Sequence, residues 1–348
     1  MTRAERALLG LVVLVTALAG VARYASGFSH VAAFVLATLA LAGGAWIVSF
    51  ATEQIGERLG PAVTGLLQST VGNLPEFFVV IFALNAGQLV VAQTAIVGSI
   101  LVNALLVLGL VVIAGASRSR EKVMRFSPRL PNDTATLVLI ATFIIVLIGL
   151  ANAAGDPASH HVKTISIVGA IAILVVYGLW LSQYLRSDVD RQSAEPRLGA
   201  VTAVALLVAA GTASAFVSDW FVHSLQPTIN TLHISQAFAG LVIVAIAGNA
   251  VENAAGIALA ARGHAELAIS VVKNSVAQIA AFLYPLLVLV SLLTATTLTF
   301  ALAPVYIGAL FGTAVIMWQV TGDGEATVFE GAALVAAFVI LATVAAFE

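Results

Sequence analysis

The chain has 348 residues, of which 61% are hydrophobic and only 9% are charged. Soluble domains typically contain about 45–50% apolar and about 25% charged residues, so this composition excludes a soluble protein. Sparse charges with a net charge of −2 exclude a nucleic-acid partner, and the absence of cysteine excludes disulfides and thiolate metal sites.

Long apolar segments follow one another along the whole chain. A helix needs about 20 apolar residues to cross the hydrocarbon of a bilayer. Eleven segments meet this requirement: 7–25, 31–53, 61–86, 88–115, 133–152, 162–185, 198–221, 236–262, 265–291, 298–318 and 327–346. They are about twice as long as the strands of a membrane barrel and do not alternate. The sequence therefore predicts an all-α polytopic membrane protein with eleven transmembrane helices.

The first segment, which follows the charged start at 1–6, resembles a signal peptide. No small-residue cleavage site follows it, so we interpret it as a retained helix. Twelve Lys and Arg residues fall on the side of the N-terminus and two on the opposite side, while Lys273 lies within a span. The positive-inside rule then predicts a cytoplasmic N-terminus, an external C-terminus and insertion in the cell membrane.

A motif, G-N-x-x-E, occurs at 72–76 in the third predicted span and again at 248–252 in the eighth. The copies are 176 residues apart, and the same offset relates Ser99 to Ser275. This spacing predicts two copies of a five-helix unit, and because five is odd the second copy enters the membrane from the opposite side. Such inverted repeats are typical of secondary transporters. The predicted division is an extra helix at 1–28, a first repeat at 29–186, a cytoplasmic linker at 187–197 and a second repeat at 198–348.

Two acidic residues, Glu76 and Glu252, lie about 15 and 16 residues into their predicted spans, close to the middle of the bilayer. An ionisable group at that depth is a functional hypothesis by default. The two helices enter from opposite faces, so we expect the carboxylates to meet. Amide and hydroxyl oxygens nearby would complete an all-oxygen shell of the kind that Ca²⁺ prefers. The predicted cation ligands are Glu76, Glu252, Asn73, Asn249, Ser99 and Ser275.

The same acids predict proton coupling. Burial and mutual repulsion favour protonation of an empty site, whereas a divalent cation favours the ionised pair and displaces the protons. One cation and protons thus compete for Glu76 and Glu252, which is the basis of antiport. The glycine before each motif asparagine loosens its helix, and Pro75 frees a backbone carbonyl one turn earlier, at Val71. Supporting roles are considered for Gly72, Gly248, Asn103, Gln278, Glu53 and Lys273.

Each of these residues also has a structural interpretation. The asparagines and serines could join helices by hydrogen bonds. Glu53 is either a solvated helix end or a recruiter of ions at the cytoplasmic entrance, and we favour the first. We expect Lys273 to extend to the cytoplasmic surface rather than serve the site. Asp219, at the outer end of the seventh span, is a candidate for attracting cations, and ordinary loop positions are expected for four histidines: His160, His161, His223 and His233.

With these residues in view, the chain resembles the calcium/cation antiporter superfamily, in its cation/proton exchanger branch. The first signature lies at 64–76 and 98–109 and the second at 248–252, 275–279 and Pro285, with Ala51-Thr52-Glu53 similar to the family pattern in the second span. The resemblance implies that Glu76 and Glu252 bind the ion, that the second and seventh spans are sliding gate helices, and that Ca²⁺ is exchanged for protons. Some members of the family are oligomers, so the resemblance also implies a homo-oligomer.

The sequence also departs from that family. Asn253 stands where a histidine often follows the second acid, and Asn274 replaces a glycine. Leu74-Pro75-Glu76 is also similar to the sodium/calcium exchanger branch. Exchange of Na⁺ for Ca²⁺, or transport of Mn²⁺, Na⁺ or K⁺, therefore remains an alternative within the class. From other classes, an intramembrane enzyme using the Glu pair and a channel are the alternatives. No phosphate-binding loop motif supports ATP-driven pumping, and no cofactor is expected beyond the transported Ca²⁺ and protons.

Overall fold

The computed structural model describes residues 1–59, 72–186 and 197–348, with 56–59, 129–131, 184–186 and 251–252 described as backbone alone. Within that part of the chain, nine helices are long and apolar enough to cross a membrane. A tenth crossing is formed if Gln236–Gly248 and Asn253–Ala261, which are bent by 59°, count as one span. Of the third predicted span, Leu74–Asn85 forms a shorter apolar helix, whereas 60–71 lie outside the described residues. The protein is thus an all-α polytopic membrane protein, and the count of eleven stays a prediction.

The first half of the chain contains α1 (Arg3–Tyr24), α2 (His30–Leu59), α4 (Leu74–Asn85), α5 (Leu89–Leu101), the π-helix η1 (Val102–Val107), α6 (Leu108–Ala116), β1 (Val123–Arg125), α7 (Arg129–Ala154), the 3₁₀-helix η2 (Pro157–His161) and α8 (Val162–Arg186). The second half contains α9 (Ala200–Leu232), α10 (Gln236–Phe238), η3 (Ala239–Val244), α11 (Ala245–Gly248), α12 (Ala250–Ala261), α13 (Ala265–Gln278), η4 (Ile279–Leu283), α14 (Tyr284–Val290), η5 (Ser291–Leu293), α15 (Pro304–Thr321), β2 (Glu325–Thr327) and α16 (Val328–Ala346).

Helix bounds in the two halves repeat at the offset of the motif. Both ends of α4 and α12 are 176 residues apart, and so are the first residues of α5 and α13 and of α6 and α14. A π-helix interrupts each of the two longer spans, as η1 in the first and η4 in the second. A π-helical turn often occurs at functional sites, and apolar periodicity alone predicted neither of these.

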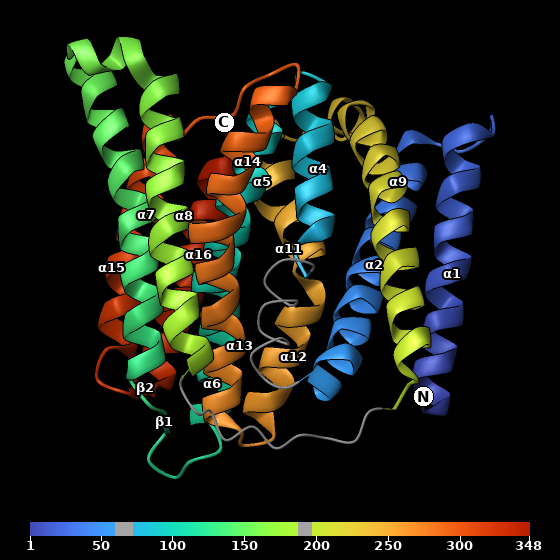
Figure 1. Ribbon diagram of the computed structural model, residues 1–348, viewed down its shortest axis with the longest axis horizontal. Helices are drawn as coiled ribbons and strands as arrows, with labels where there is room; N and C mark the ends of the chain where they lie inside the picture. Colours follow the sequence, from blue (N-terminus) through green and yellow to red (C-terminus); the bar gives the residue numbers. More distant parts are fainter. Residues whose placement is uncertain (60–71, 187–196) are drawn as a thin grey trace.

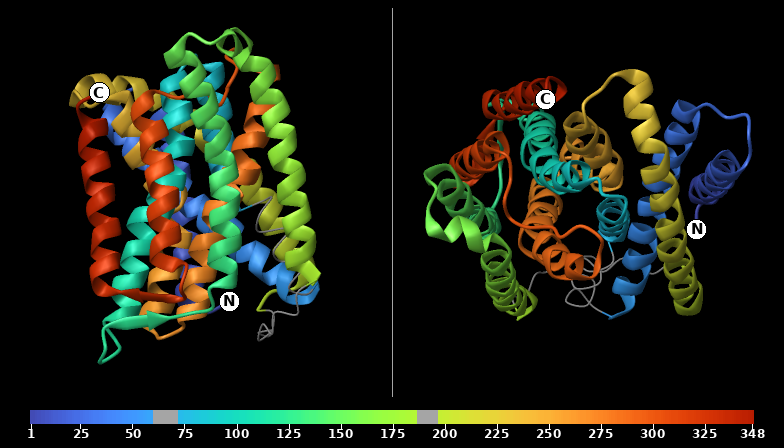
Figure 2. Two further views of the ribbon diagram at one scale, coloured as in Figure 1. Left: turned by 90° about the vertical axis from the view of Figure 1, so that its left-hand side faces the viewer. Right: turned by 90° about the horizontal axis from the view of Figure 1, so that it is seen from above.

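Helices α1, α2 and α9 form a layer beside the other helices, with α1 outermost (Figure 2). Helix α2 packs against α9 along its length, and α1 packs against both. The first helix therefore packs as part of the folded bundle. Its N-terminus has a capping box, in which Thr2 and Glu5 satisfy each other's backbone groups.

At the end of the molecule where the N-terminus lies, the loop after α6 pairs with the loop after α15 through β1 and β2, whereas the C-terminus lies at the opposite end (Figure 1). In this antiparallel pair of strands, Val123 lies opposite Thr327 and Arg125 lies opposite Glu325. The Arg125 guanidinium donates hydrogen bonds to the carboxylates of Glu325 and Glu121, and these contacts raise its pKa above the usual value. Exposed pairs of this kind contribute little to stability, so the sheet serves mainly to join the two halves.

The seventh span differs most from its predicted bounds. Helix α9 continues to Leu232, beyond Pro227, where a span ending at residue 221 was expected. His223 consequently lies within a helix, and the expectation that it occupies a loop is wrong. The helix stops at His233, which adopts a left-handed conformation with φ of 55°. A proline is tolerated inside a long membrane helix because neighbouring groups satisfy the freed carbonyl.

Candidate cation site

The two motif asparagines occupy equivalent breaks in the backbone. Asn73 precedes α4 with φ and ψ of −92° and 15°, and Asn249 precedes α12 with −99° and 9°. Each is preceded by a glycine, which weakens the helix at that point. The break places both asparagine side chains in the interior, where each is at most 3% exposed.

A chain of polar hydrogen bonds joins the two halves at this level. The Asn103 amide donates to Asn249 Oδ1 at 2.8 Å, and the Asn249 amide donates to Ser99 Oγ at 3.0 Å. All three residues are buried. Because a carbonyl or hydroxyl oxygen has two lone pairs, Asn249 Oδ1 and Ser99 Oγ each retain one that can face a cation.

Glu76 is the third residue of α4 and is only 6% exposed. Its carboxylate packs against the second copy of the motif, because a Cβ added at Gly248 would meet Glu76 Oε1 at 2.9 Å and Cγ at 3.0 Å. Glu252 is the equivalent third residue of α12. Its side chain lies outside the described residues, so the predicted meeting of the two carboxylates stays a prediction.

The other predicted site residues lie at different depths. Ser275 is buried on α13, Gln278 is half-buried at the end of that helix, and Gly72 is half-buried before Asn73. Glu53 is exposed near the end of α2 and forms an ion pair with Arg197 at 3.4 Å. Val71, whose carbonyl was expected to be freed by Pro75, lies outside the described residues.

Lys273 is fully buried, with 0% of its surface exposed, and the expectation that it extends to the surface is wrong. Helix α13 is surrounded by α6, α7, α12 and η1, so the side chain has no route along the outside of the bundle. Among the described residues its Nζ has no hydrogen-bond partner.

We expect Lys273→Met to raise the apparent melting temperature of the purified protein by about 3 °C or more. A buried cation without a partner is strongly destabilising, and methionine fills a similar volume without charge. Thermal unfolding in detergent measures the change. A lower melting temperature would instead reveal a favourable partner for the ammonium group.

We expect Gly248→Ala to reduce transport by about tenfold or more while the protein still folds. The added methyl group would meet the flexible end of Glu76, which can move away at little cost in stability but no longer holds its position. Initial transport rates and melting temperature test this. Gly308→Ala is the matched control, because a Cβ at Gly308 has nothing within 4 Å.

One site neighbour was missed by sequence reasoning. The hydroxyl of Ser218 on α9 lies 3.4 Å from the carbonyl oxygen of Pro75, next to Glu76. A serine directly before the acidic Asp219 in a predicted membrane span was the available signal. This contact brings α9 to the turn that carries the acid.

A buried carboxylate packed against Gly248, next to hydrogen-bonded amide and hydroxyl groups from both halves of an all-helical membrane bundle, is typical of a membrane transporter. The chain belongs to the sodium/calcium exchanger protein family, which matches residues 29–183 and 202–347.

Known relatives extend over most of the chain. It is 32% identical to the vacuolar calcium ion transporter of Schizosaccharomyces pombe over 324 residues, which is 88% of this chain and 77% of that protein. It is 30% identical to the Ca²⁺/H⁺ antiporter ChaA of Bacillus subtilis over 84% of this chain and 85% of the relative. The solved structure of native YfkE superposes with a TM-score of 0.81 at 27% identity, covering 98% of this chain and 99% of YfkE.

Proposed function

We propose that this protein is a secondary active antiporter that exports Ca²⁺ from the cytoplasm in exchange for protons by alternating access. The observation that carries the proposal is the buried Glu76 carboxylate against Gly248, beside hydrogen-bonded amide and hydroxyl groups from both halves. The names of the relatives in fission yeast and Bacillus subtilis support Ca²⁺ as the transported ion and, for the latter, protons as the counter-ion.

The proposed cation shell consists of carboxylates from Glu76 and Glu252 and neutral oxygens from Asn73, Asn249, Ser99 and Ser275. No group of three or more acidic or imidazole side chains gathers within the described part of the chain, so neutral oxygens would supply much of the coordination. Ca²⁺ accepts such mixed oxygen shells. When the cation leaves, protons take its place on the two acids. The transporter therefore does not switch the side to which the site opens while the site is empty and charged.

The proposed architecture is an extra helix at 1–28, repeats at 29–186 and 198–348, and a linker at 187–197. The shared offset of 176 residues in helix bounds and the two separate family matches support this division. Within the layer of α1, α2 and α9, helices α2 and α9 would act as the gate and move against the helices that hold the site. The cation-rich end with β1 and β2 would face the cytoplasm, as the positive-inside rule requires, and the surrounding apolar helices would contact lipid.

Purified protein in proteoliposomes tests the function. A proton gradient, acidic inside, should drive ⁴⁵Ca²⁺ uptake in the absence of Na⁺. Uptake driven only by a Na⁺ gradient would favour the sodium/calcium exchange alternative, and Ca²⁺ flux without counter-transport would indicate a channel. Absence of both fluxes would leave an intramembrane enzyme with a Glu pair as the alternative.

A further inference from the structure

A cavity of about 280 Å³ lies between the C-terminal end of α4 and the middle of α9. Four polar side chains line it together with apolar ones: Phe82, Asn85, Ala86, Gln88, Asp219, Val222 and His223. None of these residues belongs to the repeated motif.

The cavity lies farther along α4 than the buried acid, because Glu76 is the third residue of that helix and Phe82 and Asn85 are at its other end. Asp219 follows Ser218, whose hydroxyl lies 3.4 Å from the Pro75 carbonyl, directly before Glu76. At its other end the cavity reaches Asn85 and Gln88, in the turn between α4 and α5. That turn lies at the end of the bundle opposite to the N-terminus (Figure 1). An ion that moved along α4 between Glu76 and that end of the molecule would pass this cavity.

Chemically, the lining suits a divalent cation. Asp219 and His223 are four residues apart on α9, so their side chains share one face. No ion pair joins Asp219 to a basic side chain in the described chain. Across the cavity, Gln88 Oε1 is buried and has no hydrogen-bond donor among the described residues. A carboxylate, an available amide oxygen and an imidazole thus surround one space.

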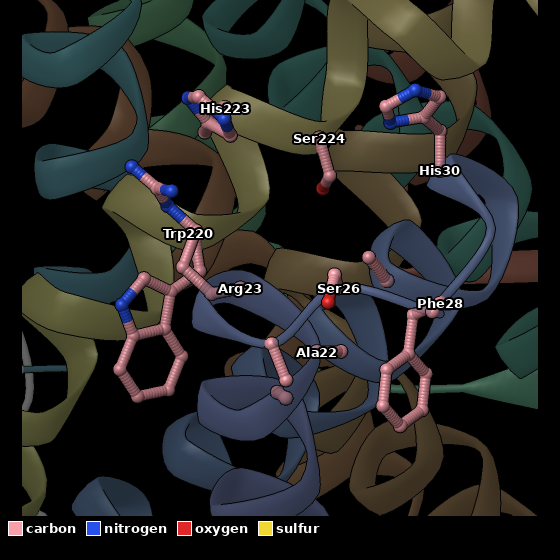
Figure 3. A pocket seen from close by; sticks show the side chains of 12 residues that line it. Ala22, Arg23, Ser26, Phe28, His30, Trp220, His223 and Ser224 are labelled. Carbon is pink, nitrogen blue, oxygen red and sulfur yellow. The ribbon is translucent and has the colours of Figure 1, made fainter.

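Charges on the other side of His223 restrict the position of the cation. His223 also lines a neighbouring cavity of about 200 Å³ together with Arg23, His30 and Ser224 (Figure 3). The guanidinium of Arg23 carries a permanent positive charge there. A cation is therefore repelled from the side of α1 and attracted toward Asp219, where the α4–α5 turn offers only amides.

We propose that this cavity is a second, external cation-binding site, in which Asp219 and Gln88 hold Ca²⁺ transiently on its way from Glu76 and His223 completes the lining. The proposal rests on the antiport function proposed above. It assigns Asp219 a role in binding on the external side, separate from the exchange of cation for protons at Glu76.

Terbium luminescence tests the site without transport. Tb³⁺ replaces Ca²⁺ in oxygen sites and emits when excited through a nearby tryptophan. Trp220 follows Asp219 in the chain and lines the neighbouring cavity that shares His223. In protein with Glu76→Gln, we expect tryptophan-sensitised emission that Ca²⁺ displaces. Adding Asp219→Asn should reduce this emission at least about fivefold, whereas Asp219→Glu should retain it.

Asp156→Ser is the matched control at the same end of the molecule. Asp156 is exposed and its side chain accepts a hydrogen bond from the Ala158 amide, a cap that serine preserves while the charge is removed. Emission unaffected by Asp219→Asn would overturn the second site. Absence of proton-driven Ca²⁺ uptake by the wild-type protein would instead contradict the antiport function. The terbium experiment would still show whether the cavity binds a cation.

Discussion

Glu76→Gln is expected to abolish proton-driven Ca²⁺ uptake, to the level of empty liposomes, while the protein remains folded in the membrane. Glutamine has nearly the same shape, but it can neither neutralise a divalent cation nor release a proton when the cation binds. The carboxylate is buried against Gly248. Removal of a buried charge does not remove packing, so the melting temperature should stay the same or rise.

The measurement compares ⁴⁵Ca²⁺ uptake by wild type and variant at equal reconstituted amounts, with size-exclusion chromatography as the test of folding. Glu121→Gln is the matched control, because Glu121 is an exposed acid in the loop after α6 that pairs with Arg125. If the Glu76→Gln protein retained gradient-driven uptake, Glu76 would not be part of the ion site, and the proposed mechanism would be wrong.

Much of the fold follows from hydropathy, because a bilayer admits few alternatives to apolar helices. Predicted and observed bounds agree within a few residues for α8, α13–α14 and α16. The point at which a helix ends is harder to predict from hydropathy, as α9 shows. Its end depends on whether neighbouring helices satisfy the backbone around Pro227, which is a tertiary property. The β1–β2 pair was also unforeseen, because three-residue strands in polar loops leave no periodic signal.

Candidate site residues could be predicted from the repeat because symmetry places equal residues at equal depth. The hydrogen bond from Asn103 to Asn249 could not be predicted from the repeat, because it depends on how η1 packs against the break before α12. His223 was misplaced because α9 continues beyond its predicted end, whereas Lys273 was misplaced for another reason. A polar residue in an apolar run gives no indication of which neighbour covers it, and the helices around α13 decide this for Lys273.

Gly98→Ala is expected to lower stability more than any other single methyl addition considered, by about 3 kcal/mol or more. An added Cβ at Gly98 would meet both Cα and the carbonyl oxygen of Leu241 at 2.5 Å. These are backbone atoms of η3, so no side-chain rotation relieves the overlap and α5 must move away. Close backbone contact at small residues is what holds membrane helices together, since lipid is as apolar as a leucine side chain.

Thermal unfolding of the purified protein should show the melting temperature falling by about 5 °C or more. Gly312→Ala is the control, because a Cβ at Gly312 has nothing within 4 Å and alanine favours helix more than glycine does. Transport by any folded Gly98→Ala protein should fall as well, because Ser99 is the next residue and its hydroxyl accepts from Asn249. An unchanged melting temperature would mean that α5 and η3 do not pack this closely. The hydrogen bonds that join the two halves at Asn249 would then lose their structural basis.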